Sequence, residues 1–306
     1  MKQHEIHTPL AAQTEFRCGM FDTTTTPDTC EFNPSLIDHD GKRFLITRKA
    51  RLVAPGQWNN TIASREIDDQ MRVGPAIEIA MKNRVQQYED PRAFRFRGCW
   101  HVGCANYLNT VLWPVHQSIH RIEFDGVKWS EGIRLDIEYR GNGDSIKTGT
   151  RHEKNWTFFD DFGRLKLIYQ AAGHHEVADA DGLDVHRTTA PTWAFGELRG
   201  GSNPVLVGSE YWCFFHSSTP WVAPQRRYHM GAYVFDAAPP YRITRMTRTP
   251  ILSGSQAEPR RFRGPLVVFP GGALIRDGIW TVVFGVNDEE CGWIQIPHSE
   301  LERMVT

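Results

Sequence analysis

One short pattern occurs five times along this chain of 306 residues, and it restricts the fold more than any other feature. Each copy opens on a motif containing Pro or Trp, mostly after a polar residue, and continues through two apolar stretches separated by a Gly/Asp turn. Apolar runs bounded by Gly, Asp or Asn are typical of β-hairpins. The copies read FNPSLIDHDGKRFLITR from Phe32, EDPRAFRFRGCWHVGCA from Glu89, KNWTFFDDFGRLKLIYQ from Lys154, SNPVLVGSEYWCFFH from Ser202 and VVFPGGALIRDGIWTVVFG from Val267.

The repeats predict an all-β fold, a five-bladed β-propeller, because short strands recurring every roughly 40–65 residues are typical of propeller blades. In a propeller the innermost strand of each blade lines a central channel, where a functional site is expected. Polar residues at equivalent blade starts would converge there. The starts are Asn33, Asp90, Asn155, Asn203 and Pro270. The alternative is a β-sandwich whose hairpins resemble one another by coincidence.

We expect a single propeller domain over residues 31–306, because no low-complexity linker divides this part of the chain. Residues 1–30 are polar and include four consecutive threonines, so we expect an irregular arm that wraps the body, or partial disorder. Near the other end, Ser299–Val305 could form a short helical turn that closes the last blade.

Composition excludes several classes of function. The net charge of -1 gives no sign of a nucleic-acid or anionic-membrane partner. No apolar run is long enough to span a membrane, and the first residues lack the apolar core of an export signal, so we expect a cytoplasmic protein. The six cysteines are then free thiols. Three conspicuous histidines lack acidic or Cys partners at ligand spacing, so we expect no metal site: His174, His175 and His186.

The segment Tyr88–Arg92, with the sequence YEDPR, is the strongest candidate for chemistry. A proline at the start of a strand costs no ladder hydrogen bond. Arg92 close to Asp90 could keep one carboxylate ionised while burial raises the pKa of a neighbour, as a general acid requires. The alternative is a purely structural ion pair at the beginning of the strand.

The EDPR motif at the start of a blade resembles the signature of glycoside hydrolase family 130, whose members are five-bladed propellers acting on β-mannosidic bonds. Further segments resemble motifs of this family in the same order. They are FNPS at Phe32–Ser35 followed by ITR ending at Arg48, HEKNWTFF from His152, FFHSS with His216, the run YHMGAYVFDAAPPYRITRMTRTPIL from Tyr228, and the closing VVFPGGALIRDGIWTVVFGVND ending at Asp288. The resemblance spans about Phe32 to Ile296.

The resemblance implies roles for individual residues. Asp90 matches the position taken as the general acid, which in this family is thought to work through a sugar hydroxyl. Arg151, His152 and Lys154 fall near the family's anion-binding region. The residues expected to bind the sugar are Asn33, Ser35, Arg48, Arg92, Asn155, Asn203, His216, Tyr228 and Asp288. The expected partner is an oligosaccharide or sugar, in a protein that could form homo-oligomers.

Two departures from the family pattern bear on the reaction. Family phosphorylases carry a Pro-Pro-x-Lys run in the fourth blade, whereas this chain has Asn203-Pro204-Val205-Leu206 without a lysine. The closing Gly-Ala-Ala-Asp is here Gly285-Val286-Asn287-Asp288. An inverting hydrolase needs a base carboxylate instead, for which Glu153, Glu197 and Glu210 are the candidates.

Three functions therefore remain open. The first is a glycoside phosphorylase or inverting hydrolase without metal or organic cofactor, for which inorganic phosphate or a sugar phosphate could serve as co-substrate. The second is an inverting glycosyltransferase, similar to a mannosyltransferase, that uses an activated sugar. The third is a sugar-binding propeller without catalytic activity. The presence of Asp90, Arg48 and Asp288 together argues against the third.

Overall fold

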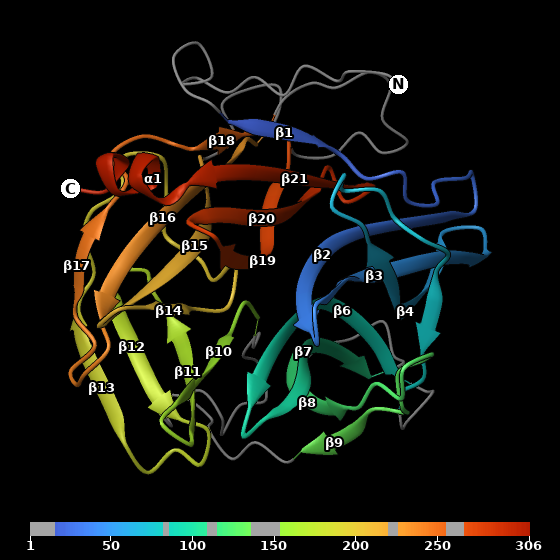
Figure 1. Ribbon diagram of the computed structural model, residues 1–306, viewed down its shortest axis with the longest axis horizontal. Coiled ribbons are helices and arrows are strands. Elements are labelled where there is room, and N and C mark those ends of the chain that lie inside the picture. The colour runs from blue at the N-terminus through green and yellow to red at the C-terminus, as the bar shows by residue number, and fades with distance from the viewer. Residues whose placement is uncertain (1–15, 82–85, 109–114, 136–153, 220–225, 255–265) are drawn as a thin grey trace.

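The computed structural model describes residues 16–81, 86–108, 115–135, 154–219, 226–254 and 266–306, and these form five antiparallel sheets. The sheets are arranged radially around one axis (Figure 1). The predicted all-β, five-bladed propeller is therefore confirmed, and the alternative of a β-sandwich is wrong.

In each blade the strands follow one another outward from the axis. Blade 1 contains β2 (Thr29–His39), β3 (Lys42–Ala54), β4 (Gln57–Ile67) and β5 (Ile77–Ile79). Blade 2 contains β6 (Gln86–Phe96), β7 (Cys99–Leu108), β8 (Val115–Ile122) and β9 (Ile133–Leu135). Blade 3 contains β10 (Thr157–Asp161), β11 (Arg164–Gln170), β12 (His174–Asp179) and β13 (Val185–Thr189).

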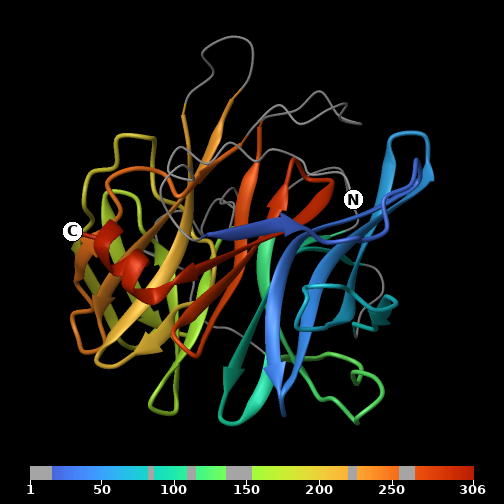
Figure 2. The ribbon, with the colours of Figure 1, turned by 45° about the horizontal axis from the view of Figure 1, so that its top comes forward.

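Blade 4 has an additional short strand. It contains β14 (Val205–Val207), β15 (Glu210–Ser218), β16 (Tyr228–Asp236) and β17 (Ile243–Met246), while β18 (Leu252–Ser253) also pairs with β16. The long β3–β4 hairpin of blade 1 extends beyond the neighbouring blades (Figure 2).

The last blade joins the two ends of the described chain. It contains β19 (Val268–Arg276), β20 (Ile279–Val286) and β21 (Glu290–Pro297), with β1 (Arg17–Met20) paired to β21 as the outermost strand. Residues 17–20 were expected to lie in an irregular arm, and for them that expectation is wrong. They complete the last sheet because the backbone groups of β21 would otherwise lack a partner strand.

A short helix, α1 (His298–Met304), follows β21 and buries Leu301 against the last two blades. The helical turn predicted near Ser299–Val305 is thus confirmed. Val305 then bridges to Thr247 beside blade 4, which fastens the end of the chain to the neighbouring blade. No helix among the described residues is long and apolar enough to cross a membrane.

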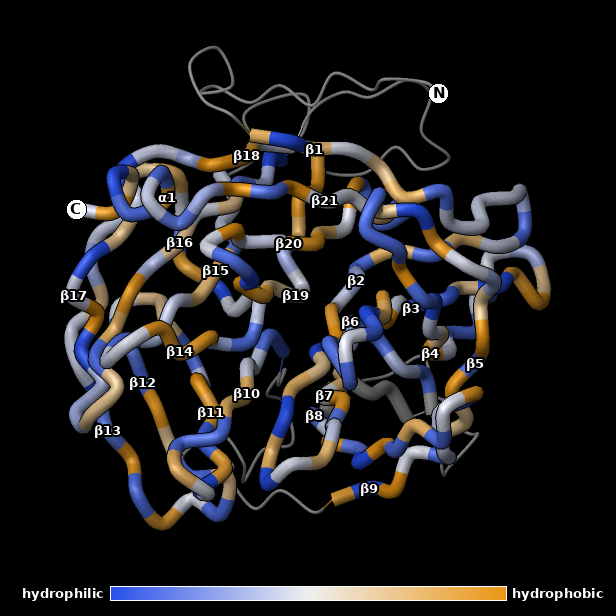
Figure 3. Tube along the Cα trace, viewed as in Figure 1, coloured by the Kyte–Doolittle hydropathy of each residue, from blue (hydrophilic) through white to orange (hydrophobic). Residues whose placement is uncertain are grey.

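The hydrophobic core is divided into clusters that lie between adjacent blades. Phe44 and Ile46 of blade 1 pack with Val102 of blade 2, while Leu45 packs on the opposite face with Val283 of blade 5. The inner strands are therefore buried on both faces, which explains the continuous apolar runs of the repeats. Figure 3 accordingly shows apolar positions around the whole ring and not in one centre.

Candidate functional site

The polar blade starts are turned toward the axis by irregular backbone. The β2–β3 pairing shifts register between Phe32 and Ser35, and the β6–β7 pairing shifts between Glu89 and Arg92. Asn33 and Asp90, inside these bulges, have φ of 49° and 51°. Asn and Asp adopt such left-handed backbone more readily than other non-glycine residues. The bulges thus re-aim two side chains out of their strands, as bulges near active sites commonly do.

Asn33 joins two carboxylates that are far apart in the sequence. Its Nδ2 donates to Asp90 Oδ1 at 2.8 Å and to Asp288 Oδ1 at 3.5 Å. Asn33 is 3% exposed, and its Oδ1 has no hydrogen-bond partner among the described residues. Asp288 also has a left-handed backbone, with φ of 57°. Blades 1, 2 and 5 therefore meet at one amide group.

Arg48 holds the carboxylates of the EDPR segment from the neighbouring blade. Its guanidinium pairs with Glu89 and lies 3.6 Å from Asp90 Oδ1. Its Nε donates to Asn60 Oδ1 at 3.0 Å, and its charge stacks on the Phe32 ring, 4.7 Å from the centroid. These contacts fix the guanidinium beside Asp90 in one orientation.

Arg92 and Lys154 add positive charge on the side of blade 3. Arg92 is 1% exposed and donates from Nε to the Gly201 carbonyl at 2.8 Å. A second Arg92 nitrogen lies 3.4 Å from Asn155 Oδ1, which is the next blade start. Lys154 pairs with Glu89 at 3.4 Å. Glu89 therefore bridges two cations, and the whole group is connected across three blades.

The charges of this cluster give the carboxyl groups of Asp90 and Asp288 different pKa values. Burial alone would raise the pKa of the Asp90 carboxyl. The positive charges of Arg48 and Arg92 outweigh burial, together with Lys154 and the Asn33 hydrogen bond, so the pKa lies below its ordinary value. Low solvation, supported by the negative charge of Asp90, instead raises the pKa of Asp288. Water reaches the exposed Asp288 side chain, which limits the size of that shift.

His216 and Tyr228 form an aromatic pair on blade 4. Their rings stack with centroids 5.7 Å apart, and His216 also lies 4.9 Å from the Phe269 ring. Burial, with the charges of Arg92 and Arg199, lowers the pKa of His216 to about 3. The ring is therefore neutral, with Nδ1 as the donor of the 2.8 Å bond to the Gly200 carbonyl, which leaves Nε2 as an acceptor. Arg92 lies over the same Phe269 ring and thereby connects this pair to the Asp90 cluster.

Two residues expected to bind sugar instead connect blades. Ser35 is fully buried, and its hydroxyl accepts the backbone N–H of Ala93 at 2.9 Å. Asn203 accepts the N–H of Phe158 at 2.7 Å and donates to the Ala93 carbonyl at 2.8 Å. Asn203 precedes its strand and does not have the left-handed backbone of Asn33, Asp90 and Asn155, so its side chain stays between the blades.

The candidates for a base carboxylate are not assembled with Asp90. Glu197 is exposed in the loop before β14, and no contact joins it to Asp90 within the described part of the chain. Glu210 begins β15 and pairs with Arg245 on β17, which lies beyond β16 in the same sheet. Glu153 lies outside the described residues, as do Arg151 and His152 of the expected anion site. The described residues contain no cluster suited to a metal ion.

Two residues at the site were not predicted. Glu89 belongs to the EDPR motif, but a role was predicted only for Asp90; in the structure Glu89 bridges Arg48 and Lys154. Asn60 fixes Arg48 from β4, and no motif marked it in the sequence. Its role depends on the register between β3 and β4. Arg48 lies opposite Ile62, and Asn60 is two residues before Ile62 on β4.

Comparison with known proteins provides structural relatives. No known family profile and no curated protein matches the sequence. The β-1,2-mannobiose phosphorylase of Listeria innocua, solved with β-1,2-mannobiose, superposes with a TM-score of 0.67 at 16% identity, over 97% of this chain and 96% of that one. The mannose phosphorylase MPT-4 of Leishmania mexicana, solved with phosphate, has a TM-score of 0.59 at 15% identity, over 91% and 86%.

A third structure comes from work on the GH130 mannoside phosphorylases and their hydrolase members, which target β-1,2 mannosidic linkages in Candida mannan. It has a TM-score of 0.66 at 15% identity, over 89% of this chain and 85% of that one. All three matches cover nearly the whole propeller, at identities that establish the fold alone. The chain therefore has the five-bladed β-propeller fold of the mannoside phosphorylases and hydrolases of glycoside hydrolase family 130.

Proposed function

We propose that the protein is a glycoside-active enzyme that cleaves or forms a β-mannosidic bond, with Asp90 as the proton donor. The observation that carries the proposal is the position of Asp90 on a left-handed bulge, between Asn33 and Arg48 and opposite Asp288. The structural relatives act on mannosides, which agrees with this choice of substrate. Asp288 and Asn33 would bind hydroxyls of the sugar ring, and Arg48 would bind a further oxygen.

We favour phosphate over water as the second reactant. Among the described residues, the base candidates Glu197 and Glu210 make no contact with Asp90, so neither is placed to activate a water molecule. Arg92 and Lys154 supply donors and positive charge suited to a phosphate.

Phosphate would also help Asp90 to acquire its proton. The free site keeps the pKa of Asp90 low, mainly because Arg48 and Arg92 oppose the effect of burial. An anion bound beside these cations offsets their charge and raises the pKa of Asp90. Substrate binding and protonation of the acid would then be coupled, and a proton could pass through a sugar hydroxyl to the leaving oxygen.

Product analysis tests the proposal. β-1,2-Mannobiose is incubated with the protein, with and without inorganic phosphate, and the products are separated. Phosphorolysis yields mannose 1-phosphate and mannose, only with phosphate. Release of mannose alone at the same rate in both samples supports the hydrolase. Failure to cleave any of a panel of β-mannosides in either sample, by a folded protein, refutes the proposal.

A further inference from the structure

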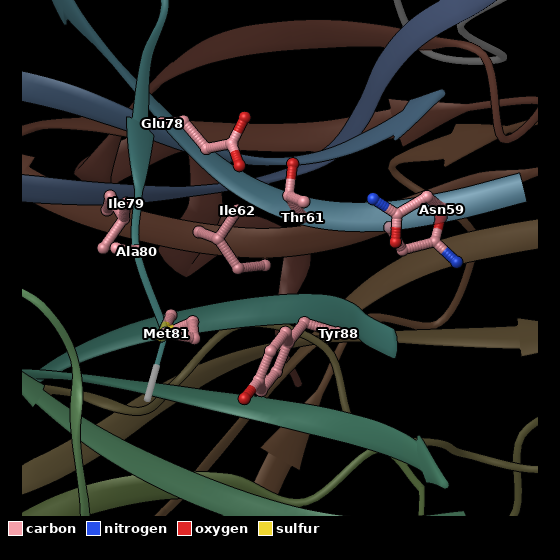
Figure 4. A pocket seen from close by; sticks show the side chains of 9 residues that line it. Asn59, Thr61, Ile62, Glu78, Ile79, Ala80, Met81 and Tyr88 are labelled. Atoms are coloured by element: carbon pink, nitrogen blue, oxygen red, sulfur yellow. The ribbon is translucent and has the colours of Figure 1, made fainter. Parts of the chain in front are cut away.

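A pocket separate from the Asp90 cluster lies between blades 1 and 2 (Figure 4). It is formed by β4, β5, the residues directly after β5, and the beginning of β6. Its volume of about 350 Å³ falls in the lower part of the range of about 300–1,000 Å³ for small-molecule sites. A single small ligand therefore fits it.

The walls of the pocket combine a polar side with an apolar side. Figure 4 shows Glu78, Thr61 and Asn59 along one side and Met81 and Tyr88 on the other. Met81 and Tyr88 are buried, at 5% and 3% exposed. A sugar ring has a similar division, with an apolar C–H face and a rim of hydroxyls. Glu78 is the one charged side chain among the described lining residues, so the pocket does not favour an anion such as phosphate.

Asn60 connects this pocket to the Asp90 cluster. It is part of the pocket wall, and its Oδ1 accepts the hydrogen bond from Arg48 Nε. The backbone N–H of Asn60 donates to Gln87 Oε1 at 2.7 Å, which ties β4 to β6 just before Asp90. Asn60 and Asp90 therefore contact opposite parts of the same guanidinium.

We propose that the pocket binds a neutral sugar ring and is a second sugar site, joined to the Asp90 site through Asn60. The inference rests on the proposed function, which provides the sugar. The ring is either the distal unit of a substrate chain or a separate sugar molecule, because both present the same hydroxyls and C–H face. Glu78 and Thr61 bind the hydroxyls, and Met81 and Tyr88 contact the apolar face.

The methyl group of Met81 provides a reporter inside the pocket that does not depend on catalysis. Methionine methyls are labelled with ¹³C in the Asp90→Asn protein, and Met81→Leu identifies its signal. Mannose, β-1,2-mannobiose and β-1,2-mannotriose are then titrated, with calorimetry on the same samples. We expect the Met81 signal to shift with the bound sugar, while the signal of Met230, buried in the core between blades 4 and 5, stays in place.

Two substitutions make the titration specific. Glu78→Gln replaces the charged acceptor by a neutral one, so the affinity measured from the Met81 signal falls about three- to tenfold, which is the difference between a charged and a neutral hydrogen bond. Glu66→Gln changes an exposed carboxylate of the same blade that pairs with Lys42, and it leaves the response unchanged. Ala80→Leu fills the pocket from its exposed rim and abolishes the response.

The outcomes separate this inference from the proposed function. A shift with mannose identifies a separate sugar, and a shift only with mannotriose identifies the distal unit of a chain. A Met81 signal that stays in place while calorimetry records sugar binding overturns the pocket assignment, even if mannosides are cleaved. A Met81 response in the Asp90→Asn protein, combined with a wild-type protein that cleaves no mannoside, supports the pocket and refutes the function.

Discussion

Replacing Gly285 by Ala tests whether Asn33 organises the site. Gly285 lies in β20, and a Cβ atom built on it would overlap Asn33 Oδ1 and come within 2.9 Å of the backbone nitrogen of Asn33. The methyl group therefore has to displace Asn33 from its position between Asp90 and Asp288. Overpacking of this kind typically costs about 1–3 kcal/mol of unfolding free energy. We expect a melting temperature lower by a few degrees in a protein that still folds.

The catalytic effect has two opposing parts. Losing the Asn33 hydrogen bond removes one influence that lowers the pKa of Asp90, which would favour the acid form. The cations that contribute more strongly remain, so the loss of orientation dominates. A hydrogen bond to a charged group is worth about 1.5–3 kcal/mol, which corresponds to about a 10- to 100-fold fall in kcat/KM.

Steady-state kinetics on a mannoside substrate measure this effect, in a double-mutant cycle with Asn33→Ala. If the methyl group acts through Asn33, Gly285→Ala causes little further loss once Asn33 is already Ala. Gly74→Ala serves as the control, because the nearest atom to its added Cβ is 3.7 Å away. Full additivity of the two substitutions, or wild-type kinetics of Gly285→Ala, would refute the argument.

Three further predictions concern the acid, its titration and the connections between blades. Asp90→Asn lowers kcat about 10²–10⁴-fold with sugar binding by calorimetry retained, and near-normal turnover would remove Asp90 from its role. Lys154→Gln removes a cation that keeps the pKa of Asp90 low, so the basic limb of the kcat/KM–pH profile moves to higher pH, and saturating phosphate moves it in the same direction. A basic limb that moves to lower pH would contradict this sign, and Lys42→Gln is the surface control. Asn203→Ala leaves the Phe158 N–H without its buried acceptor and lowers unfolding free energy by about 1–3 kcal/mol in denaturant titration, and an unchanged midpoint would contradict its role between blades.

The resemblance predicts that Asp90 is the acid and Asp288 a sugar ligand, and the structure adds a physical reason why the two carboxyl groups differ. Both lie close to Asn33, yet only Asp90 is surrounded by Arg48, Arg92 and Lys154. Partial removal from water is the main influence that raises the pKa of Asp288, and the negative charge of Asp90 adds to it. Two carboxylates at one amide can therefore have different protonation states at the same pH.

The sequence by itself determined the number of blades and the strands that form them. Runs such as FLI at Phe44 and WCFF at Trp212 are apolar at successive positions, and strands buried on both faces require that pattern. The Asn33-Pro34 and Asp90-Pro91 starts also marked where the inner strands depart from regular pairing. These signals are local, because each depends on neighbouring residues within one hairpin.

Only the tertiary structure decided which polar starts serve the site. Asn33 and Asn203 begin similar motifs, but Asn33 lies in a left-handed bulge and reaches Asp288, 255 residues away, whereas Asn203 bonds the backbone between blades. Likewise, Asn60 and Gly285 became important only when β4 was placed beside β6 and β20 beside β2. Such contacts arise from the packing of one blade on the next, and nothing in a single hairpin's sequence specifies which of its atoms will face the neighbouring blade.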